Sequence, residues 1–329
     1  MEQMSQLEVL KLLADGRNHS REKIIESFGL PSSLLSEYIK NFGNLGLDLV
    51  VDCKKSYRLS RPIEFLDTNK ILSPLCDSMT QKIYRLEIFQ ELESTNSYLL
   101  DTFVPKARRL SVCLAEYQSS GRGRFGRKWS APFGGSLCIS MGWVFDEKPE
   151  NLSALSLSAA VVVRQVIGDL TNCYPMIKWP NDLVWKDKKL GGILTESSPK
   201  KDGSLYVVVG IGINLSMNSA WLSKVCDWPE GATDLSSISS GEPLKNLLAS
   251  RLIEGIYTML ESYSRTGFSS HIDDFASANY LKGRKVSLLG EGSDLSGVVA
   301  SVDSDGSLLL ETKTGSHRIV AGEVSLRAS

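Results

Sequence analysis

Residues 110–129 read LSVCLAEYQSSGRGRFGRKW, a strand pattern followed by a glycine-rich basic loop. The three glycines of the loop allow its backbone to approach a ligand closely. Arg122, Arg124, Arg127 and Lys128 place four positive charges within seven residues, a pattern suited to binding phosphate or carboxylate groups. Trp129 adds a ring that can stack on a nucleobase. An exposed basic loop or an RNA-binding segment is the alternative, but one short patch in a neutral chain favours an anion-binding loop.

Strand and helix patterns alternate around this loop and predict an α/β or α+β domain of catalytic size over residues 81–272. We expect strands at Leu110–Glu116, Ser136–Val144 and Tyr206–Ile213. We expect helices at Leu152–Leu170 and Leu244–Tyr263.

Residues 1–66 have the layout of a helix-turn-helix unit. Ser20 is placed to cap a helix that Gly29 ends, and a second helix is expected over Ser32–Lys40. The short apolar runs Leu47–Val51 and Ser56–Leu59 are expected to form a wing hairpin. The N-terminal segment is therefore predicted to be a winged helix-turn-helix domain.

The charges of this unit give less support to DNA binding than its layout does. Its nine basic residues are balanced by nine acidic ones, and the expected second helix offers Lys40 beside Glu37. A helix that reads DNA normally presents several Arg, Lys, Asn or Gln side chains. A helical dimerisation or capping domain is the alternative.

Two further segments complete the chain. Polar and turn-forming residues over 67–80 predict a linker with at most one helical turn. Residues 273–329 contain short strand patterns separated by glycine turns, which predict a small β-barrel. Its strands are expected at Arg284–Leu289, Gly297–Val302, Ser307–Glu311 and Ser316–Val320.

The composition is that of a folded protein without bulk charge. Hydrophobic residues make up 42% of the chain and charged residues 23%, and the net charge is −1. Attraction of the whole surface to nucleic acid or to a membrane is therefore excluded, and any contact with a polyanion needs a local patch.

No apolar run reaches the roughly 18 residues of a membrane span, and the first ten residues lack a signal-peptide pattern, so we expect a cytoplasmic protein. The six cysteines include no CxxC pair and the three histidines no metal-ligand spacing, so neither a zinc site nor a disulfide framework is expected.

A second cluster of polar residues follows a short strand at Lys178-Trp179-Pro180-Asn181-Asp182. Pro180 fixes the turn, and the oxygens of Asn181 and Asp182 are suited to a polar ligand or a Mg²⁺ ion. Lys188 and Lys189 precede a Gly-Gly strand, where one ammonium group can face developing negative charge. A β-hairpin with two solvated lysines is the alternative, and taken alone this cluster favours it.

Two more motifs carry small polar groups or glycines. The run Gly210-Ile211-Gly212-Ile213-Asn214 lies inside a strand and is not a dinucleotide-binding fingerprint, because no helix opens after it. Glycines within a strand indicate a ligand or another backbone packed tightly against it. In Glu93-Ser94-Thr95-Asn96, the hydroxyl and amide groups can bind a ureido or amide group, or cap a helix, or do both.

Taken together, these motifs resemble the biotin protein ligase family, in particular its bacterial members that act as ligase and repressor. The segments Glu93–Asn96, Glu116–Trp129, Lys178–Asp182, Lys189–Gly192 and Gly210–Asn214 occur in the family's order and spacing, and the resemblance covers nearly the whole chain. It implies an α+β multidomain fold with four parts. These are a winged helix-turn-helix domain at 1–66, a linker at 67–80, a central mixed-sheet catalytic domain at 81–272 that resembles class II aminoacyl-tRNA synthetases, and an SH3-like β-barrel at 273–329.

The resemblance also implies the activity and its partners. A biotin–[biotin carboxyl-carrier protein] ligase uses biotin and ATP, with Mg²⁺, to form biotinyl-5′-AMP and passes the biotinyl group to one lysine of a carrier protein. A bifunctional member also represses biotin synthesis genes, binding operator DNA as a homodimer when the adenylate is bound. The chemistry needs positive charge that aligns two anions and needs no enzyme nucleophile, which fits the absence of a Ser-His-Asp or Cys-His pattern.

By the same resemblance, individual residues are expected to take the family's roles. Biotin-binding residues would be Ser94, Thr95, Asn96, Gln118, Arg122, Gly123, Arg124 and Lys189. Residues acting on the adenylate would be Lys178, Asp182, Lys189 and Arg124, with Lys178 at the α-phosphate and Asp182 hypothesised to orient the acceptor lysine. The ATP side would be lined by Trp129, Asn181, Asn214 and Arg127, and DNA would be bound by the helix-turn-helix from His19 to Lys40.

The sequence departs from the family at two places. Phe125 stands where the family often has another arginine, and the expected wing, Cys53–Tyr57, lacks the usual glycines. Two other functions are weighed: a DNA-binding regulator that senses biotin without catalysis, and a lipoate-type ligase. A sensor would not need the whole set of residues expected for adenylation, and this chain has them all: Lys178, Asn181, Asp182 and Lys189. Gly121–Trp129 followed by Lys178–Asp182 resembles the biotin-specific members more closely than the lipoate-specific ones. A lipoate enzyme would also not need residues 1–66.

Overall fold

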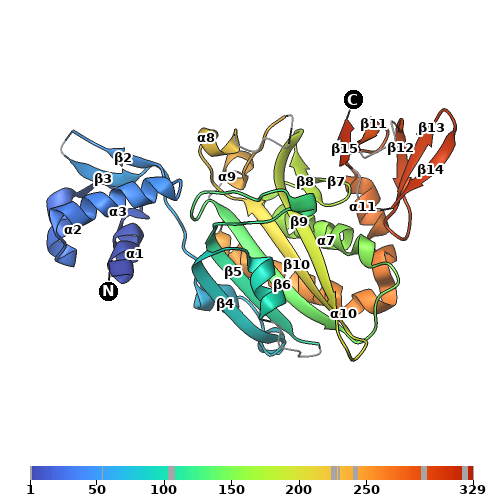
Figure 1. Cartoon of the computed structure of the whole chain (residues 1–329), viewed down its shortest axis with the longest axis horizontal. Coiled ribbons are helices and arrows are strands. Elements are labelled where there is room, and N and C mark those ends of the chain that lie inside the picture. Colours follow the sequence, from blue (N-terminus) through green and yellow to red (C-terminus); the bar gives the residue numbers. More distant parts are fainter. Residues whose placement is uncertain are drawn as a thin grey trace.

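The computed structural model describes residues 2–53, 55–102, 108–223, 228, 230–239, 244–289, 295–320 and 325–328. Its strands form sheets of three, seven and five strands. The N-terminal unit and the C-terminal sheet lie at opposite ends of the long axis, with the seven-stranded sheet between them (Figure 1).

The N-terminal unit contains the two helices and the hairpin that its sequence predicts. Ser20 caps the second helix by accepting a hydrogen bond from the Lys23 amide at 3.3 Å, and Gly29 ends that helix in the left-handed region at φ 61°. A core of its own holds the unit together, with Leu13, Ile24 and Leu35 fully buried. The elements are α1 (Glu2–Leu13), β1 (His19–Ser20), α2 (Arg21–Phe28), α3 (Ser32–Asn44), β2 (Leu49–Val51) and β3 (Ser56–Leu59).

The segment 67–80, predicted as a linker, is helical over part of its length. These residues make two short helices, α4 (Thr68–Leu72) and α5 (Asp77–Thr80). Ile71, Leu75 and Met79 are buried in the same cluster as the central sheet, so the whole segment packs on the central domain. Phe65 still packs on the N-terminal core and Leu66 already belongs to the central one, so the two units meet without a free connector.

The seven-stranded sheet has the order β4-β5-β6-β10-β9-β8-β7. The β4–β5 pair is parallel and all other neighbours are antiparallel. The three predicted strands are observed with small extensions at their ends. The bounds are β4 (Ile83–Leu92), β5 (Leu110–Gln118), β6 (Ser136–Phe145), β7 (Met176–Lys178), β8 (Asp182–Trp185), β9 (Lys188–Pro199) and β10 (Leu205–Asn214).

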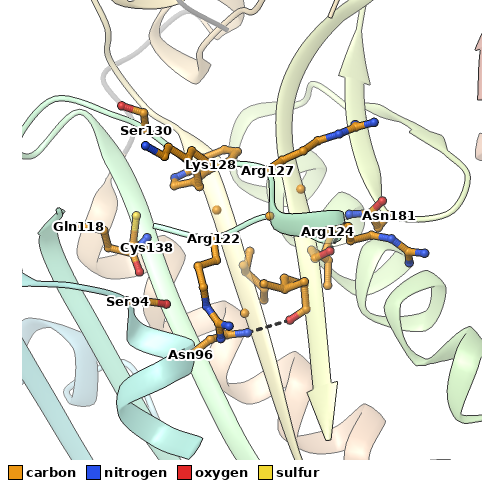
Figure 2. Close-up of a pocket in the computed structure, with 18 of the residues that line it drawn as sticks. Ser94, Asn96, Gln118, Arg122, Arg124, Arg127, Lys128, Ser130, Cys138 and Asn181 are labelled. Atoms are coloured by element: carbon orange, nitrogen blue, oxygen red, sulfur yellow. Dashed lines mark hydrogen bonds between the residues drawn. The ribbon is translucent and has the colours of Figure 1, made fainter. Parts of the chain in front are cut away.

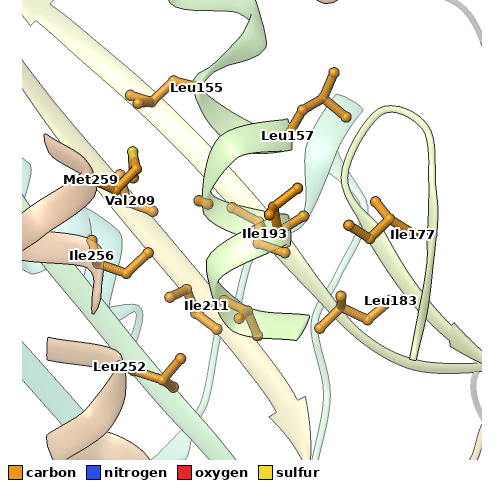
Figure 3. Packing of buried hydrophobic residues seen from close by; sticks show 14 of the residues in the cluster. Leu155, Leu157, Ile177, Leu183, Ile193, Val209, Ile211, Leu252, Ile256 and Met259 are labelled. Carbon is orange, nitrogen blue, oxygen red and sulfur yellow. The ribbon is translucent and has the colours of Figure 1, made fainter. Parts of the chain in front are cut away.

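One face of this sheet is covered by the two long helices α7 (Leu155–Thr171) and α10 (Lys245–Thr266). Figure 3 shows Leu155 of α7 and Ile256 and Met259 of α10 around Val209 of the sheet, with Leu157 of α7 on the side of Ile193. The segment Leu152–Thr171, which includes the short 3₁₀ turn η2 (Leu152–Ala154), is long and apolar enough to cross a membrane. It is largely buried against the sheet, as a core helix of a folded domain is.

The opposite face is covered only in part, by the short helix α6 (Thr95–Asp101), which packs on β5, β6 and β10. Side chains alternate along each strand, so Val112 and Leu114 of β5 point to the helix-covered face, while Cys113 points to the α6 side. The rest of this second face is free to form a binding site.

The C-terminal segment forms an open sheet in the order β14-β13-β12-β11-β15, not the closed barrel that the sequence predicts. Closure requires the two end strands to pair, and no such pairing occurs within the described residues. Buried residues such as Val286, Val299 and Leu308 instead join the core of the central domain. The elements are η3 (Gly267–His271), α11 (Ile272–Ala278), β11 (Lys285–Leu289), β12 (Ser296–Val302), β13 (Leu308–Thr312), β14 (Gly315–Ile319) and β15 (Ser325–Ala328).

Candidate functional site

A cavity of about 540 Å³ opens on the partly covered face of the central sheet (Figure 2). All residues predicted for ligand binding line it, except Lys178. They come from the start of α6, the end of β5, the basic loop and strands β8, β9 and β10. The predicted members are Ser94, Thr95, Asn96, Gln118, Arg122, Gly123, Arg124, Arg127, Trp129, Asn181, Asp182, Lys189 and Asn214.

The first turn of α6 provides one end of the cavity. Ser94 caps the helix by accepting from the Ser97 amide at 3.4 Å, and it also lines the cavity, so capping is confirmed and ligand binding stays a prediction. The Thr95 amide donates to Gln118 Oε1 at 2.8 Å, which ties the helix to the end of β5. Ser94, Thr95 and Asn96 are each only 4% exposed. Buried hydroxyl and amide groups with fixed partners form a rigid polar surface for a neutral polar ligand.

Ser140 of β6 does not line the cavity but holds Thr95 and Asn96 from within the sheet, and the sequence prediction did not include it. Its hydroxyl lies 2.6 Å from both Thr95 Oγ1 and Asn96 Oδ1. In the sequence, Ser140 is a single serine within an apolar strand pattern, which carries little information about function. The structure shows that it is fully buried.

The glycines of β10 create the room for these groups. A Cβ atom at Gly210 would lie 2.1 Å from Asn96 Oδ1, and one at Gly212 would lie 2.7 Å from Trp129 Cε2. These glycines were predicted to admit a ligand or another backbone; in the structure the side chains of Asn96 and Trp129 occupy the space that a side chain at 210 or 212 would take.

The basic loop folds over the cavity as a short turn held by its own backbone. The Gly123 amide donates to the Arg127 carbonyl at 2.7 Å, and the Trp129 amide donates to the Gly121 carbonyl at 2.9 Å. A 3₁₀ turn, η1 (Arg124–Gly126), forms the tip, where Phe125 adopts φ 55° and is 54% exposed. Phe125 thus points to solvent at the position where the family often has an arginine.

Arg124 of the loop lies beside Asn181, away from Asn96 and Gln118 (Figure 2), and Asp182 and Lys189 of the neighbouring strands also line the cavity. Burial lowers the pKa of the Arg124 guanidinium, and the Asp182 carboxylate acts in the opposite direction. Lys189 Nζ lies 2.7 Å from Asp182 Oδ1, and both side chains are less than one-fifth exposed. Mostly cationic groups around one carboxylate are suited to binding an anion.

The turn between β7 and β8 places Asn181 and Asp182 beside β9. Asn181 Nδ2 donates to the Ile193 carbonyl at 2.8 Å, and the Ile193 amide returns a bond to the Asn181 carbonyl at 2.9 Å. Asn214 is fixed from the other side, because its Nδ2 donates to the Thr233 carbonyl at 2.9 Å. These amides therefore line the cavity in fixed orientations.

Lys178 stands behind this turn and does not line the cavity. Its Nζ lies 3.9 Å from the ring centroid of Trp228, a cation–π contact. Burial lowers the pKa of the Lys178 ammonium, while the Asp182 carboxylate raises it. The role predicted for Lys178 at the α-phosphate stays a prediction; in the structure its ammonium stacks on the Trp228 ring, and the Lys189 Nζ lies 5.7 Å from the centroid of the same ring.

The C-terminal sheet supports the same turn from outside the cavity. Trp179 is 1% exposed, and its Nε1 donates to the Gly306 carbonyl at 2.8 Å. Ser156 Oγ of α7 donates to the Pro180 carbonyl at 3.2 Å. The turn that carries Asn181 and Asp182 is thus held by two other elements, one of them in the C-terminal sheet.

Trp221 is a further wall residue that sequence reasoning missed. It belongs to the short helix α8 (Ser219–Leu222), lines the cavity and packs on the N-terminal unit. A Cβ at Gly46 would lie 2.5 Å from Trp221 Cζ2. Close by, the Phe133 amide donates to the Leu45 carbonyl at 2.9 Å, and the Phe133 ring is buried in the N-terminal core. No local pattern predicts these contacts between distant segments.

The predicted DNA-binding segment, His19 to Lys40, lies outside the cavity. Arg21 is engaged within the unit, because its guanidinium donates to Tyr57 Oη at 2.6 Å and to Ser32 and Ser36 Oγ at 2.6 and 2.9 Å. Glu37 and Lys40 of α3 are exposed. No group of three or more His, Cys, Asp or Glu side chains that could hold a metal gathers within the described part of the chain.

Comparison with known proteins gives consistent matches. Residues 88–214 match the Biotin/lipoate A/B protein ligase family, and residues 283–327 match the Biotin protein ligase C terminal domain. The bifunctional ligase/repressor BirA of Salmonella typhimurium is 32% identical over 98% of both chains, and that of Escherichia coli is 31% identical over 98% of this chain and 97% of its own. The biotin protein ligase of Aquifex aeolicus in complex with biotin and ATP superposes with a TM-score of 0.64 at 29% identity, covering 75% of this chain and 100% of its own.

Proposed function

The chain belongs to the biotin protein ligase family, and we propose that it is an ATP-dependent ligase that attaches biotin to a lysine of a biotin carboxyl carrier protein. One observation carries the proposal: a single cavity joins a rigid end of buried hydroxyl and amide groups to an end lined by cations. Biotin has a neutral ureido ring and a distant carboxylate, and the adenylate adds a phosphate next to that carboxylate. The cavity offers a complementary group to each part.

We assign the ureido ring of biotin to the α6 end of the cavity. Ser94, Thr95, Asn96 and Gln118 supply donors and acceptors there, and Ser140 holds Thr95 and Asn96 from within the sheet. Because these groups already bond to one another, they need no reordering when the ligand arrives. Arg122 and Gly123 of the loop close this end from above.

We assign the reacting carboxylate and the α-phosphate to Lys189 and Arg124. Adenylation brings two anions together, so its transition state is stabilised by fixed positive charge in a site that excludes water. Arg127, Trp129, Asn181 and Asn214 are assigned to the nucleotide. Lys178 acts from behind the turn through its charge, and we propose no direct contact for it.

Mg²⁺ would accompany the phosphates of ATP. Asp182 is the only carboxylate among the described residues that line the cavity, and it already pairs with Lys189. We therefore propose that phosphate oxygens hold the ion, with Asp182 as its one protein neighbour. When bound, the ion supplies further charge neutralisation. In the transfer step, Asp182 is proposed to orient the carrier lysine, which attacks the acyl carbon as AMP leaves.

We also propose that the protein is a biotin-responsive repressor in the cytoplasm. α2, α3 and the β2–β3 hairpin are interpreted as a winged helix-turn-helix domain, and the C-terminal sheet as a variant of the SH3-like module. The family relatives named ligase/repressor match 98% of the chain, which includes these N-terminal residues. The contacts of Trp221 with Gly46 and of Phe133 with Leu45 link the cavity wall to this domain. The proposed partner is operator DNA, bound by a homodimer when the adenylate is present.

The proposed function is tested by biotin-dependent exchange of labelled pyrophosphate into ATP. We expect exchange with biotin and none with lipoate. Exchange with lipoate alone would identify a lipoate-type ligase, and biotin binding without exchange would identify a non-catalytic sensor.

Arg124→Ala is expected to yield a folded protein that forms the adenylate but releases it about tenfold faster or more. The guanidinium lies in the loop that covers the cavity, so its loss removes a charge-assisted contact to the bound intermediate. The measurement is the amount of free biotinyl-5′-AMP in the medium without a carrier. Lys128→Ala is not a suitable control because Lys128 also lines the cavity. Lys188→Ala serves, since Lys188 is exposed and outside the cavity.

Gly306→Ala is expected to lower kcat/KM for adenylation about tenfold. Gly306 has φ +83°, and a Cβ there would lie 2.5 Å from Ala154 Cβ, so the turn that holds Trp179 must move. Gly203→Ala is the matched control, because Gly203 has φ +86° with nothing within 4 Å of a Cβ. Equal kcat/KM values for the two variants would show that the C-terminal turn does not position the site.

A further inference from the structure

Glu196 of β9 joins the basic loop to the polar end of the cavity. Its carboxylate accepts two hydrogen bonds from Arg122 Nη2, at 2.9 Å to Oε1 and 2.6 Å to Oε2. The same Oε2 accepts from Asn96 Nδ2 at 2.9 Å. The Glu196 side chain thus contacts both the glycine-rich basic loop and the buried start of α6. These two segments are more than twenty residues apart in the chain.

The position of Glu196 on the sheet makes it a fixed anchor. Glu196 of β9 lies opposite Val208 of β10. Along the same two strands, Leu194 lies opposite Gly210 and Gly192 lies opposite Gly212. Opposed residues of antiparallel strands share a face, so Glu196 lies on the cavity face in line with the wall residues Leu194 and Gly192. Its side chain is 25% exposed, against 42% for Arg122.

The bond to Asn96 determines which way its amide points. Asn96 Nδ2 donates to Glu196 and to the Leu194 carbonyl at 3.2 Å, and Asn96 Oδ1 lies 2.6 Å from the Ser140 hydroxyl. A rotated amide would place its oxygen against the carboxylate and the carbonyl. Glu196 therefore favours one amide orientation out of two.

We infer that Glu196 is a positioning residue that couples closure of the basic loop to the orientation of the Asn96 amide. This inference rests on the proposed ligase function and goes beyond it. The ion pair with Arg122 holds the loop down over the adenylate, and the bond to Asn96 keeps the biotin end ordered. Loss of the carboxylate affects both ends, whereas loss of its charge alone affects mainly the loop.

Two substitutions separate the two contacts. Glu196→Gln keeps an oxygen that accepts from Asn96 but removes the ion pair, so we expect nearly unchanged biotin affinity and release of biotinyl-5′-AMP about tenfold faster than in the wild type. Glu196→Ala removes both contacts, so we expect the same faster release together with biotin binding weakened about tenfold. The control is Glu254→Gln, which removes an exposed pair with Arg251 at 3.0 Å on α10, far from the cavity.

Exchange of the two charges provides the rescue. Arg122→Glu alone places two carboxylates together and should release the intermediate fast. Arg122→Glu with Glu196→Arg should restore slow release but not biotin affinity, because an arginine at 196 cannot accept from Asn96 Nδ2. The measurements are biotin affinity by calorimetry and adenylate release in a filter assay. Wild-type release by Glu196→Gln, or no rescue by the exchanged pair, would overturn the inference. If the wild type and Glu254→Gln form no adenylate, the proposed function itself fails.

Discussion

Lys189→Ala is expected to slow adenylate formation by roughly 10²–10³-fold, the effect of removing one fixed donor from a site that stabilises developing negative charge. Lys189 lines the cavity, and its Nζ lies 2.7 Å from Asp182 Oδ1. The alanine variant loses the ammonium and also leaves the Asp182 carboxylate without its ion-pair partner beside two incoming anions. The measurement is the single-turnover rate of adenylate formation at saturating biotin and ATP.

Lys188→Ala is the matched control for this variant. Lys188 is the preceding residue on the same strand, is exposed, and does not line the cavity. Its replacement should leave the rate within about twofold of the wild type, since an exposed charge outside the site is screened by water and salt. A Lys189→Ala variant that forms the adenylate at the wild-type rate would refute the role assigned to Lys189.

Lys245→Met is expected to lower the free energy of unfolding by about 3–5 kcal/mol, the usual cost of leaving one member of a buried ion pair without its partner. The Lys245 side chain is 2% exposed and pairs with the fully buried carboxylate of Glu116. Glu116 Oε1 also accepts from the Leu66 amide at 2.5 Å, at the point where the N-terminal unit joins the central core. The measurement is the midpoint and slope of urea unfolding.

The double variant Lys245→Met with Glu116→Gln is the control for charge. A neutral amide at 116 can still accept from Leu66, so most of the lost stability should return. Equal unfolding midpoints for wild type and Lys245→Met would contradict the importance of this pair. Loss of stability that the second substitution does not recover would assign the effect to packing.

Local signals predicted most of the regular structure. Ser20 and Gly29 mark the bounds of α2, and the long apolar strands and helices of the central domain fall within a few residues of their predicted ends. The segment 67–80 was predicted as a linker because its polar residues outnumber its apolar ones. Its burial depends on packing against the central domain, including α10, which no local pattern contains.

The sequence predicted those residues of the candidate site that lie within short motifs. The loop at 121–129 and the turns at 94–96 and 181–182 each contain their chemistry within a few residues, and all of them line one cavity. Ser140, Glu196 and Trp221 were missed because strand register and contacts between units bring them to the site. Lys178 was expected at the ligand from its motif, but its stacking on Trp228 depends on a residue fifty positions away.

The central claim is that the cavity makes an acyl-adenylate from biotin and transfers it. The most direct test incubates the protein with biotin, ATP, Mg²⁺ and a biotin carboxyl carrier domain, and determines the intact mass of the carrier and the modified residue. We predict the gain of one biotinyl group on a single carrier lysine. An unmodified carrier after prolonged incubation, with biotin bound to the protein, would contradict the claim.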